Sequence, residues 1–129
     1  PAPQSPGETV RCILESLALE YRWTADQLAD LLGKSAPVIH VVGGGSRNRL
    51  LNQYTANATR RAVIAGPAEA TALGNLIGQA VAAGELGSWE EGRALARGSE
   101  ALSEFSPADE SAWEDAYARY RRLWTHPAD

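Results

Sequence analysis

Only two stretches of this 129-residue sequence have the pattern of a β-strand, and this scarcity is the strongest constraint on its fold. Residues 38–42, VIHVV, form a β-branched run after Pro37, and residues 61–65, RAVIA, form a second run that Gly66 and Pro67 end. A sheet of two strands is marginally stable by itself. We therefore expect residues outside this chain to supply further strands.

Helical periodicity covers most of the remaining sequence. Apolar residues recur at helical spacing over residues 10–33, as one helix or as two that divide near Thr24. Further helices are predicted from Ser46 or Asn48 to Ala58, over residues 68–83, over residues 88–97 and from Ser106 to Leu123. The predicted order is helix, strand, helix, strand and three helices. This is an α/β chain that is rich in helix and has a small sheet.

Charge and cysteine content narrow the class of protein. The net charge of −4 argues against a nucleic-acid partner, because phosphate binding requires a basic surface. No apolar run is long enough to cross a bilayer, and residues 1–7 are predicted to be a flexible leader without the blocks of a secretory signal. The single cysteine, Cys12, beside Ile13 and Leu14, predicts a packed thiol in a reducing compartment. We expect a cytoplasmic protein with no membrane partner.

Three consecutive glycines, Gly43, Gly44 and Gly45, join the first predicted strand to the helix that follows it. Glycines let backbone amides approach a ligand closely, and a helix start adds unpaired N–H groups and a positive partial charge, which suits a nucleotide. The motif lacks the Lys-Ser or Lys-Thr pair of a P-loop and the third spaced glycine of a dinucleotide-binding fingerprint. From the residues alone, a ligand-approach loop and a tight turn without a ligand fit equally well.

Two longer motifs carry a resemblance to a known family. Residues 43–53, GGGSRNRLLNQ, resemble the adenosine-side glycine motif of the FGGY carbohydrate kinases, and residues 63–75, VIAGPAEATALGN, resemble the rhamnulose branch of that family. The resemblance covers nearly the whole chain and implies part of the C-terminal domain, which has a ribonuclease-H-like (actin-like ATPase) fold. It assigns residues 8–125 to this partial domain and leaves residues 126–129 as a tail.

The resemblance implies the ATP-binding part of a sugar kinase. Such an enzyme uses ATP with Mg²⁺ to phosphorylate L-rhamnulose to rhamnulose 1-phosphate. The family's Asp-x-Gly-Thr loop and its catalytic aspartate have no match here, so we expect the sugar to bind a domain outside this chain and the chain alone to be inactive. The alternatives are a kinase for another ketose, such as xylulose or fuculose, and a stand-alone module that binds a nucleotide or a partner.

The resemblance also assigns the site residues. Gly43, Gly44, Gly45 and Asn48 match nucleotide-binding positions, and Gly44 is the strongest candidate for direct contact with ATP or ADP. Asn48 fits equally well as the N-cap of the following helix. No residue is assigned to catalysis or to a metal, and Mg²⁺ is expected to arrive with ATP. Because a sheet cut out of a larger one leaves bare edges and apolar faces, we also expect self-association.

The other prominent residues are expected to be structural. His40, inside the first strand, is predicted to be packed and hydrogen-bonded, and Asp26 is predicted to be a surface or capping residue. Glu69 is predicted to favour the start of the third helix through the helix dipole. Gly74 and Gly78, one turn apart, are predicted to allow close helix packing.

Overall fold

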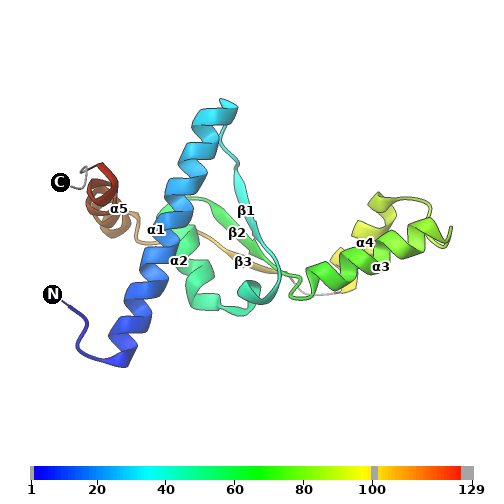
Figure 1. Cartoon of the computed structure of the whole chain (residues 1–129), viewed down its shortest axis with the longest axis horizontal. Helices are drawn as coiled ribbons and strands as arrows, with labels where there is room; N and C mark the ends of the chain where they lie inside the picture. The colour runs from blue at the N-terminus through cyan, green and yellow to red at the C-terminus, as the bar shows by residue number, and fades with distance from the viewer. Residues whose placement is uncertain (1, 100–101, 126–129) are drawn as a thin grey trace.

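The computed structural model describes residues 2–99 and 102–125 (Figure 1). The elements, in chain order, are α1 (Pro6–Leu32), β1 (Val38–Val41), the 3₁₀ turn η1 (Gly44–Arg47), α2 (Arg49–Thr59), β2 (Ala62–Ala65), α3 (Ala70–Ala82), α4 (Trp89–Ser99), β3 (Ser103–Phe105) and α5 (Glu110–Thr125). The predicted tail, residues 126–129, lies outside the described residues.

The helix α1 is continuous, which resolves the choice between one helix and two. The hydroxyl oxygen of Ser5 accepts a hydrogen bond from the backbone N–H of Glu8, and Pro6 follows at the first helical position. Gly33, with φ of 65°, ends the helix in the left-handed conformation that glycine adopts easily. Within the described residues, no helix, α1 included, is both long and apolar enough to cross a membrane.

The sheet has three strands in the order β1-β2-β3. β1 and β2 run parallel, with Val38 opposite Ala62, and β2 and β3 run antiparallel, with Val63 opposite Phe105. The two strands predicted from the sequence are therefore confirmed. β3, residues 103–105, was not predicted from the sequence. It adds a third strand from within the chain, and the expectation that residues outside the chain supply further strands stays a prediction.

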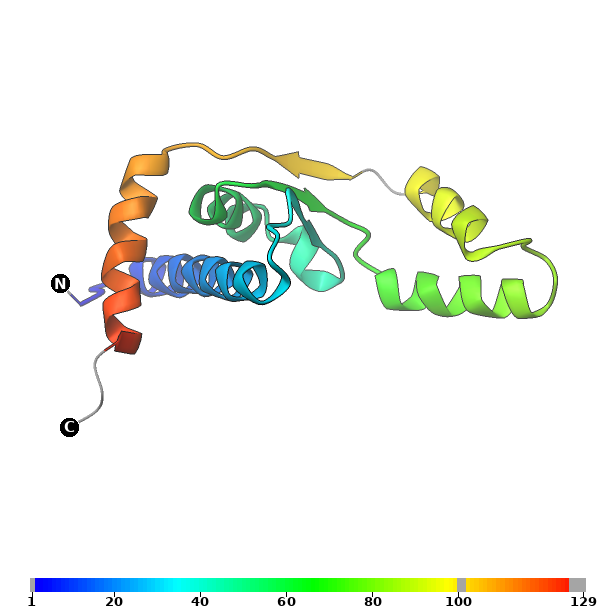
Figure 2. The ribbon, with the colours of Figure 1, turned by 90° about the horizontal axis from the view of Figure 1, so that it is seen from above.

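The helix α2 is the centre of the packing (Figure 2). One of its sides meets α1 and α5 in a buried cluster that comprises Ala18, Leu19, Ala58, Trp113 and Tyr117. Its other side meets the sheet in a second cluster that comprises Ala56, Val63, Ala65 and Phe105. Two buried threonines lie between these clusters, and the hydroxyls of Thr55 and Thr59 donate to the carbonyl oxygens of Leu51 and Thr55 in the same helix. The hydrogen bonds remove the cost of burying these polar groups.

The helices α3 and α4 form a hairpin that extends away from the other elements (Figures 1 and 2). The backbone N–H of Glu91 donates to the hydroxyl oxygen of Ser88, which caps the start of α4. A Cβ atom placed on Gly78 would lie 3.2 Å from the ring of Trp89, so the predicted close packing is confirmed there. The prediction is wrong for Gly74, where a Cβ atom would meet nothing within 4 Å.

Two side chains that the sequence predicts to be packed are exposed. Cys12 is exposed on α1, and His40 is exposed on β1. Both predictions are therefore wrong. Within the described residues β1 pairs only with β2 and forms an edge of the sheet, and the face of α1 that carries most of its apolar residues has no partner.

Candidate functional site

The glycine loop, which we define as residues 43–48, follows β1 at the carboxyl ends of the two parallel strands. The N–H of Gly43 donates to the carbonyl oxygen of Pro67 over 2.9 Å, which ties this loop to the segment after β2. Gly43 has a φ of 78°, a conformation that L side chains rarely adopt. Ligands of open α/β sheets bind at this end of the strands, so the loop lies where a ligand is expected.

The backbone conformation does not require glycine at positions 44 and 45. Neither Gly44 nor Gly45 has a positive φ. A Cβ atom on Gly45 would lie 3.9 Å from Cγ1 of Val41, which is an ordinary van der Waals contact. A Cβ atom on Gly44 would meet no atom within 4 Å. Nothing within the described residues therefore requires glycine at position 44.

Two polar side chains fix the shape of the glycine loop. The hydroxyl of Ser46 donates to the carbonyl oxygen of Gly43 over 2.7 Å. The Nδ2 group of Asn52, which is 1% exposed, donates to the carbonyl oxygen of Ser46 over 2.9 Å. Asn52 was not singled out from the sequence. The sequence did contain a signal for it. Asn52 lies one helical turn after Asn48, and the apolar periodicity of α2 predicts that this position faces the interior.

Asn48 is the N-cap of α2, which was one of its two predicted roles. Its Oδ1 atom accepts a hydrogen bond of 3.1 Å from the backbone N–H of Leu51. Its own backbone N–H donates to the carbonyl oxygen of Gly45. The Nδ2 group of Asn48 has no hydrogen-bond partner within residues 2–99 and 102–125, so capping leaves two donors available.

A pocket of about 280 Å³ lies beside the glycine loop. Ser46, Arg47 and Arg49 line it on the loop side, and Gly66 and Ser103 line it on the side of β2 and β3. The guanidinium groups of Arg47 and Arg49 and the hydroxyl of Ser103 give it hydrogen-bond donors that suit a phosphate or a ribose, whereas the hydroxyl of Ser46 already donates to Gly43. A larger groove of about 630 Å³, between α1 and β1, is mostly apolar and includes only Gly45 of the glycine loop. The smaller pocket is therefore the better candidate for a polar ligand.

Glu69 follows Ala68, one of the residues that line this pocket. It is the N-cap residue of α3, but its side chain makes no capping hydrogen bond. Its carboxylate instead lies 3.5 Å from the guanidinium of Arg47. Both side chains are more than 70% exposed, so this ion pair contributes little to stability. An anionic ligand that binds Arg47 would therefore lose little free energy by breaking this ion pair.

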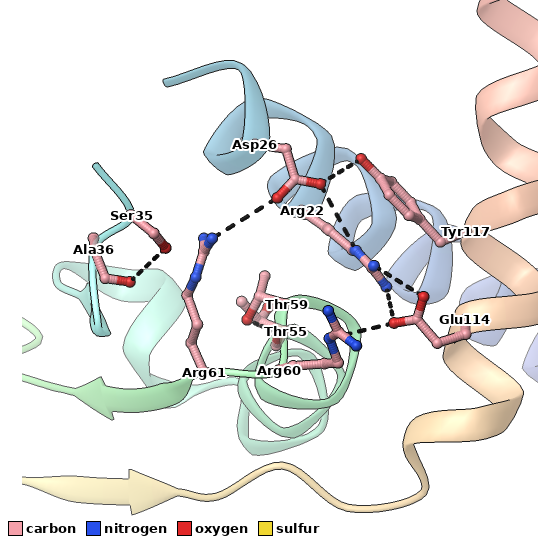
Figure 3. A network of polar contacts seen from close by, with 10 residues as sticks. All are labelled: Arg22, Asp26, Ser35, Ala36, Thr55, Thr59, Arg60, Arg61, Glu114 and Tyr117. Atoms are coloured by element: carbon pink, nitrogen blue, oxygen red, sulfur yellow. Dashed lines mark hydrogen bonds and ion pairs between the residues drawn. The ribbon is translucent and has the colours of Figure 1, made fainter. Parts of the chain in front are cut away.

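A polar network connects α1, α5 and the turn between α2 and β2 (Figure 3). The buried guanidinium of Arg22 pairs with the carboxylate of Glu114 over 2.7 Å. Asp26 accepts a hydrogen bond of 2.8 Å from the hydroxyl of Tyr117 and lies 3.8 Å from the guanidinium of Arg61. The Asp26 side chain is 42% exposed, so the predicted surface position is confirmed, but its contacts with α5 and with Arg61 were not predicted.

The network shifts the pKa values of two of its members. The hydrogen bond from Arg22 lowers the pKa of Glu114 below its ordinary value. Burial, followed by the hydrogen bond to Asp26, raises the pKa of Tyr117 to about 12. None of the network residues lines the pocket beside the glycine loop. Their arrangement holds the helices together and does not form part of the candidate site.

The described residues contain no group of three or more His, Cys, Asp or Glu side chains that would hold a metal ion. The arginines and hydroxyls of the pocket are donors and suit an anion, whereas Mg²⁺ requires oxygen ligands. The pocket thus has the chemistry to bind part of a nucleotide and lacks a carboxylate among its lining residues.

Comparison with known proteins agrees with this geometry. Residues 1–83 match the FGGY family of carbohydrate kinases, C-terminal domain. The chain is 46% identical over 121 residues to a rhamnulokinase of Bacteroides thetaiotaomicron, an alignment that covers 94% of this chain and 25% of the relative. It is 44% identical over 108 residues to a rhamnulokinase of Halalkalibacterium halodurans, covering 84% and 23%. Over 86 residues it is 55% identical to a rhamnulokinase of Enterococcus faecalis, covering 65% and 17%.

The chain spans about a quarter or less of the length of these relatives. The match over residues 1–83 includes α1, the glycine loop and all of α3. The helix-rich architecture with a small mixed sheet agrees with the ribonuclease-H-like fold of the matched domain. The chain belongs to the FGGY family of carbohydrate kinases, as a rhamnulokinase-like part of its C-terminal domain.

Proposed function

We propose that this chain is the adenosine-binding part of an ATP-dependent kinase that phosphorylates L-rhamnulose to rhamnulose 1-phosphate. The relatives described above all carry the name rhamnulokinase, which favours rhamnulose over xylulose or fuculose as the sugar. ATP would supply the phosphoryl group, with Mg²⁺ held chiefly by its phosphates. The sugar would bind residues outside this chain, and we propose the same for the residue that takes the proton from its hydroxyl.

One observation carries the nucleotide assignment. Gly44 has no positive φ, and a Cβ atom there would meet nothing within 4 Å. Glycine at an unstrained and open position costs stability without any gain inside the described residues. A ligand that lies against the backbone of Gly44 would explain why this position is a glycine. The adjoining pocket of about 280 Å³ is just below the roughly 300–1,000 Å³ of whole ligand sites, which suits a part of a nucleotide.

In this proposal each residue of the glycine loop has its own task. Gly43 turns the backbone, and Gly44 and Gly45 let the nucleotide lie against it. The Nδ2 group of Asn48 donates to the adenosine while its Oδ1 atom caps α2. Arg47 leaves its exposed pairing with Glu69 to contact a phosphate. Asn52 positions the loop through the carbonyl oxygen of Ser46 and touches no ligand.

Titration of the chain with ADP, followed by NMR of its backbone amides, tests the nucleotide assignment. We expect the largest shifts at residues 43–48. Gly44→Val should weaken ADP binding at least tenfold, on the order of 1.4 kcal/mol or more, because the side chain fills the space of the ligand. Gly98→Val is the matched control, since Gly98 also has open space around it but lies in α4, away from the loop.

Two outcomes would refute the assignment. ADP shifts that centre outside residues 43–48 would place the nucleotide elsewhere, and equal affinities for the original chain and Gly44→Val would remove its main contact. The catalytic part of the proposal has a separate test. We expect no transfer of phosphate from ATP to L-rhamnulose by this chain alone, and a measurable rate would show that the catalytic group lies within it.

A further inference from the structure

The pocket beside the glycine loop is lined by residues of α2 and of the last strand of the sheet as well as by the loop. Arg49 is the first residue of α2, and Ser103 is the first residue of β3, and both line the pocket. The nucleotide contacts proposed above involve Arg47 but neither of these two residues. The side of the pocket next to β3 therefore has polar groups to which no ligand is assigned.

An aromatic ring holds the Arg49 side chain in place. Its guanidinium carbon lies over the ring of Phe105, 5.4 Å from the ring centre. Phe105 is 6% exposed and belongs to the buried cluster beneath the sheet, so the ring is a fixed support. A cation within about 6 Å of an aromatic ring centre is attracted by the electrons of the ring face. The charge of Arg49 is thus positioned next to β3 by a neutral partner.

Ser103 lies on the same face of β3 as Phe105. Side chains alternate between the two faces along a strand, so residues 103 and 105 share one face and Glu104 lies on the other. The burial pattern agrees, because Phe105 is buried, Ser103 is half-buried and Glu104 is exposed. Ser103 also pairs opposite Ala65, another residue that lines the pocket. The hydroxyl of Ser103 and the guanidinium of Arg49 are therefore on one side of the strand, and the carboxylate of Glu104 is on the other.

The donors of these two residues are not used by the described part of the chain. Within residues 2–99 and 102–125, the Arg49 guanidinium forms no hydrogen bond or ion pair, and the Ser103 hydroxyl has no hydrogen-bond partner. Arg47 adds a second guanidinium, whose ion pair with Glu69 is exposed. No carboxylate is among the described residues that line the pocket. In a chain with a net charge of −4, the pocket is a local concentration of positive charge.

A phosphate group suits this set of donors best. Two guanidinium groups repel a metal cation. A carboxylate has two oxygens, and a single guanidinium already pairs with both in the bidentate geometry. A phosphate group carries more acceptor oxygens in a tetrahedral arrangement, so it accepts hydrogen bonds from two arginines and a hydroxyl together.

We propose that Arg49 and Ser103, together with Arg47, form a phosphate-binding subsite between the start of α2 and the start of β3. The phosphate group is either that of the nucleotide, a reading that rests on the proposed function, or that of a separate phosphate compound. The same three side chains bind it in both cases.

Titration of the chain with inorganic phosphate, followed by NMR of its backbone amides, tests the subsite. We expect shifts at Gly66, Ala68 and Ser103 that acetate at the same ionic strength does not produce. Arg49→Gln should weaken phosphate binding about tenfold, because it removes a hydrogen bond from a charged group. Arg93→Gln is the matched control and should bind phosphate like the original chain, since Arg93 is an exposed arginine of α4 outside the pocket lining.

ADP and adenosine distinguish the two sources of the phosphate group. If it belongs to the nucleotide, inorganic phosphate competes with ADP, and Arg49→Gln weakens the binding of ADP but not of adenosine. If it belongs to a separate compound, phosphate and ADP bind together, and the variant weakens the binding of phosphate alone. Both results support the subsite.

Equal shifts with acetate and phosphate would overturn the subsite, and so would equal phosphate affinities of Arg49→Gln and Arg93→Gln. Far-UV circular dichroism checks that both variants are folded. Ser103→Ala is a second test that leaves both arginines in place, and it should weaken phosphate binding about threefold. An unchanged affinity in this variant would also count against the subsite. The ADP shifts at residues 43–48 and the Gly44→Val variant judge the nucleotide assignment separately, so a negative phosphate titration refutes the subsite alone.

Discussion

Arg22 on α1 and Glu114 on α5 form two hydrogen bonds, of 2.7 and 3.1 Å, between residues that are 92 positions apart in the sequence. The guanidinium also lies 4.0 Å from the centre of the Tyr117 ring. Arg22 is 8% exposed, so its charge is removed from water and depends on these contacts. One side chain therefore links the first and last helices of the chain.

Replacement of Arg22 by methionine should lower the free energy of unfolding by about 1.5–3 kcal/mol, the usual contribution of a hydrogen bond to a charged group. Urea denaturation measures this change. Arg11→Met is the control, because Arg11 pairs with Glu15 on the exposed surface of the same helix, and its replacement should change the free energy of unfolding far less. Equal effects of the two substitutions would show that burial of Arg22 adds nothing.

Stability should fall between about pH 10 and pH 12 through Tyr117. The folded protein raises the pKa of this hydroxyl from 10.0 to about 12, so the folded state binds a proton that the unfolded state has already lost in this range. The contribution of the protonated Tyr117 hydroxyl to the free energy of unfolding is fully present below pH 10 and is lost as the pH rises through 12. Urea midpoints measured across this range should show a fall that Tyr117→Phe reduces. An identical fall in the variant would exclude Tyr117 as its source.

Alanine at positions 43 and 44 should have different effects. Gly43→Ala should lower the free energy of unfolding by about 1–2 kcal/mol, because φ is 78° and an L side chain is strained there. Gly44→Ala should leave stability unchanged or raise it by up to about 1 kcal/mol, since its Cβ meets nothing within 4 Å and alanine restricts the unfolded chain. Thermal unfolding distinguishes the two variants. Marked destabilisation by Gly44→Ala would mean that folding, and not a ligand, requires this glycine.

Packing within the α3–α4 hairpin should depend on Gly92. A Cβ atom there would lie 2.3 Å from Cγ2 of Ile77, so Gly92→Ala should destabilise the hairpin by about 1–3 kcal/mol. Gly98→Ala in the same helix meets no neighbour and should stabilise it by about 0.5–1 kcal/mol. Hydrogen exchange of the α3 and α4 amides measures both changes. Slower exchange in Gly92→Ala would contradict the packing.

The sequence was sufficient for β1, β2 and the predicted α-helices. Apolar patterns indicated most of them, and the capping box of Ser88 and Glu91 indicated α4. It was not sufficient for β3, which has three residues and carries Glu104 at its centre. That strand exists because Phe105 pairs opposite Val63 and enters the buried cluster beneath the sheet. The start of α5 was also misplaced. The backbone N–H of Ala108 donates to Asn57 on α2, so the segment after Ser106 is held by a tertiary contact and the helix begins at Glu110.

The candidate site was located from the sequence but only partly described. The glycines identified the loop, and the capping rule identified one role of Asn48. Asn52 was missed because its inward position on α2 indicates burial but does not indicate that its amide supports the loop through the carbonyl oxygen of Ser46. His40 and Cys12 were predicted to be packed because periodicity shows which residues are apolar neighbours and does not show whether a partner covers them.

Within the described residues, the two buried clusters contain residues of α1, α2, α5 and the strands, and none from α3 or α4. The hairpin is therefore expected to separate and unfold without disrupting the sheet. Protection of the β2 amides against exchange with solvent would then report the free energy of unfolding of the part formed by α1, α2, α5 and the sheet. Protection of the α3 amides would report only the free energy of unfolding of the α3–α4 hairpin. Two distinct melting processes are thus expected within 129 residues.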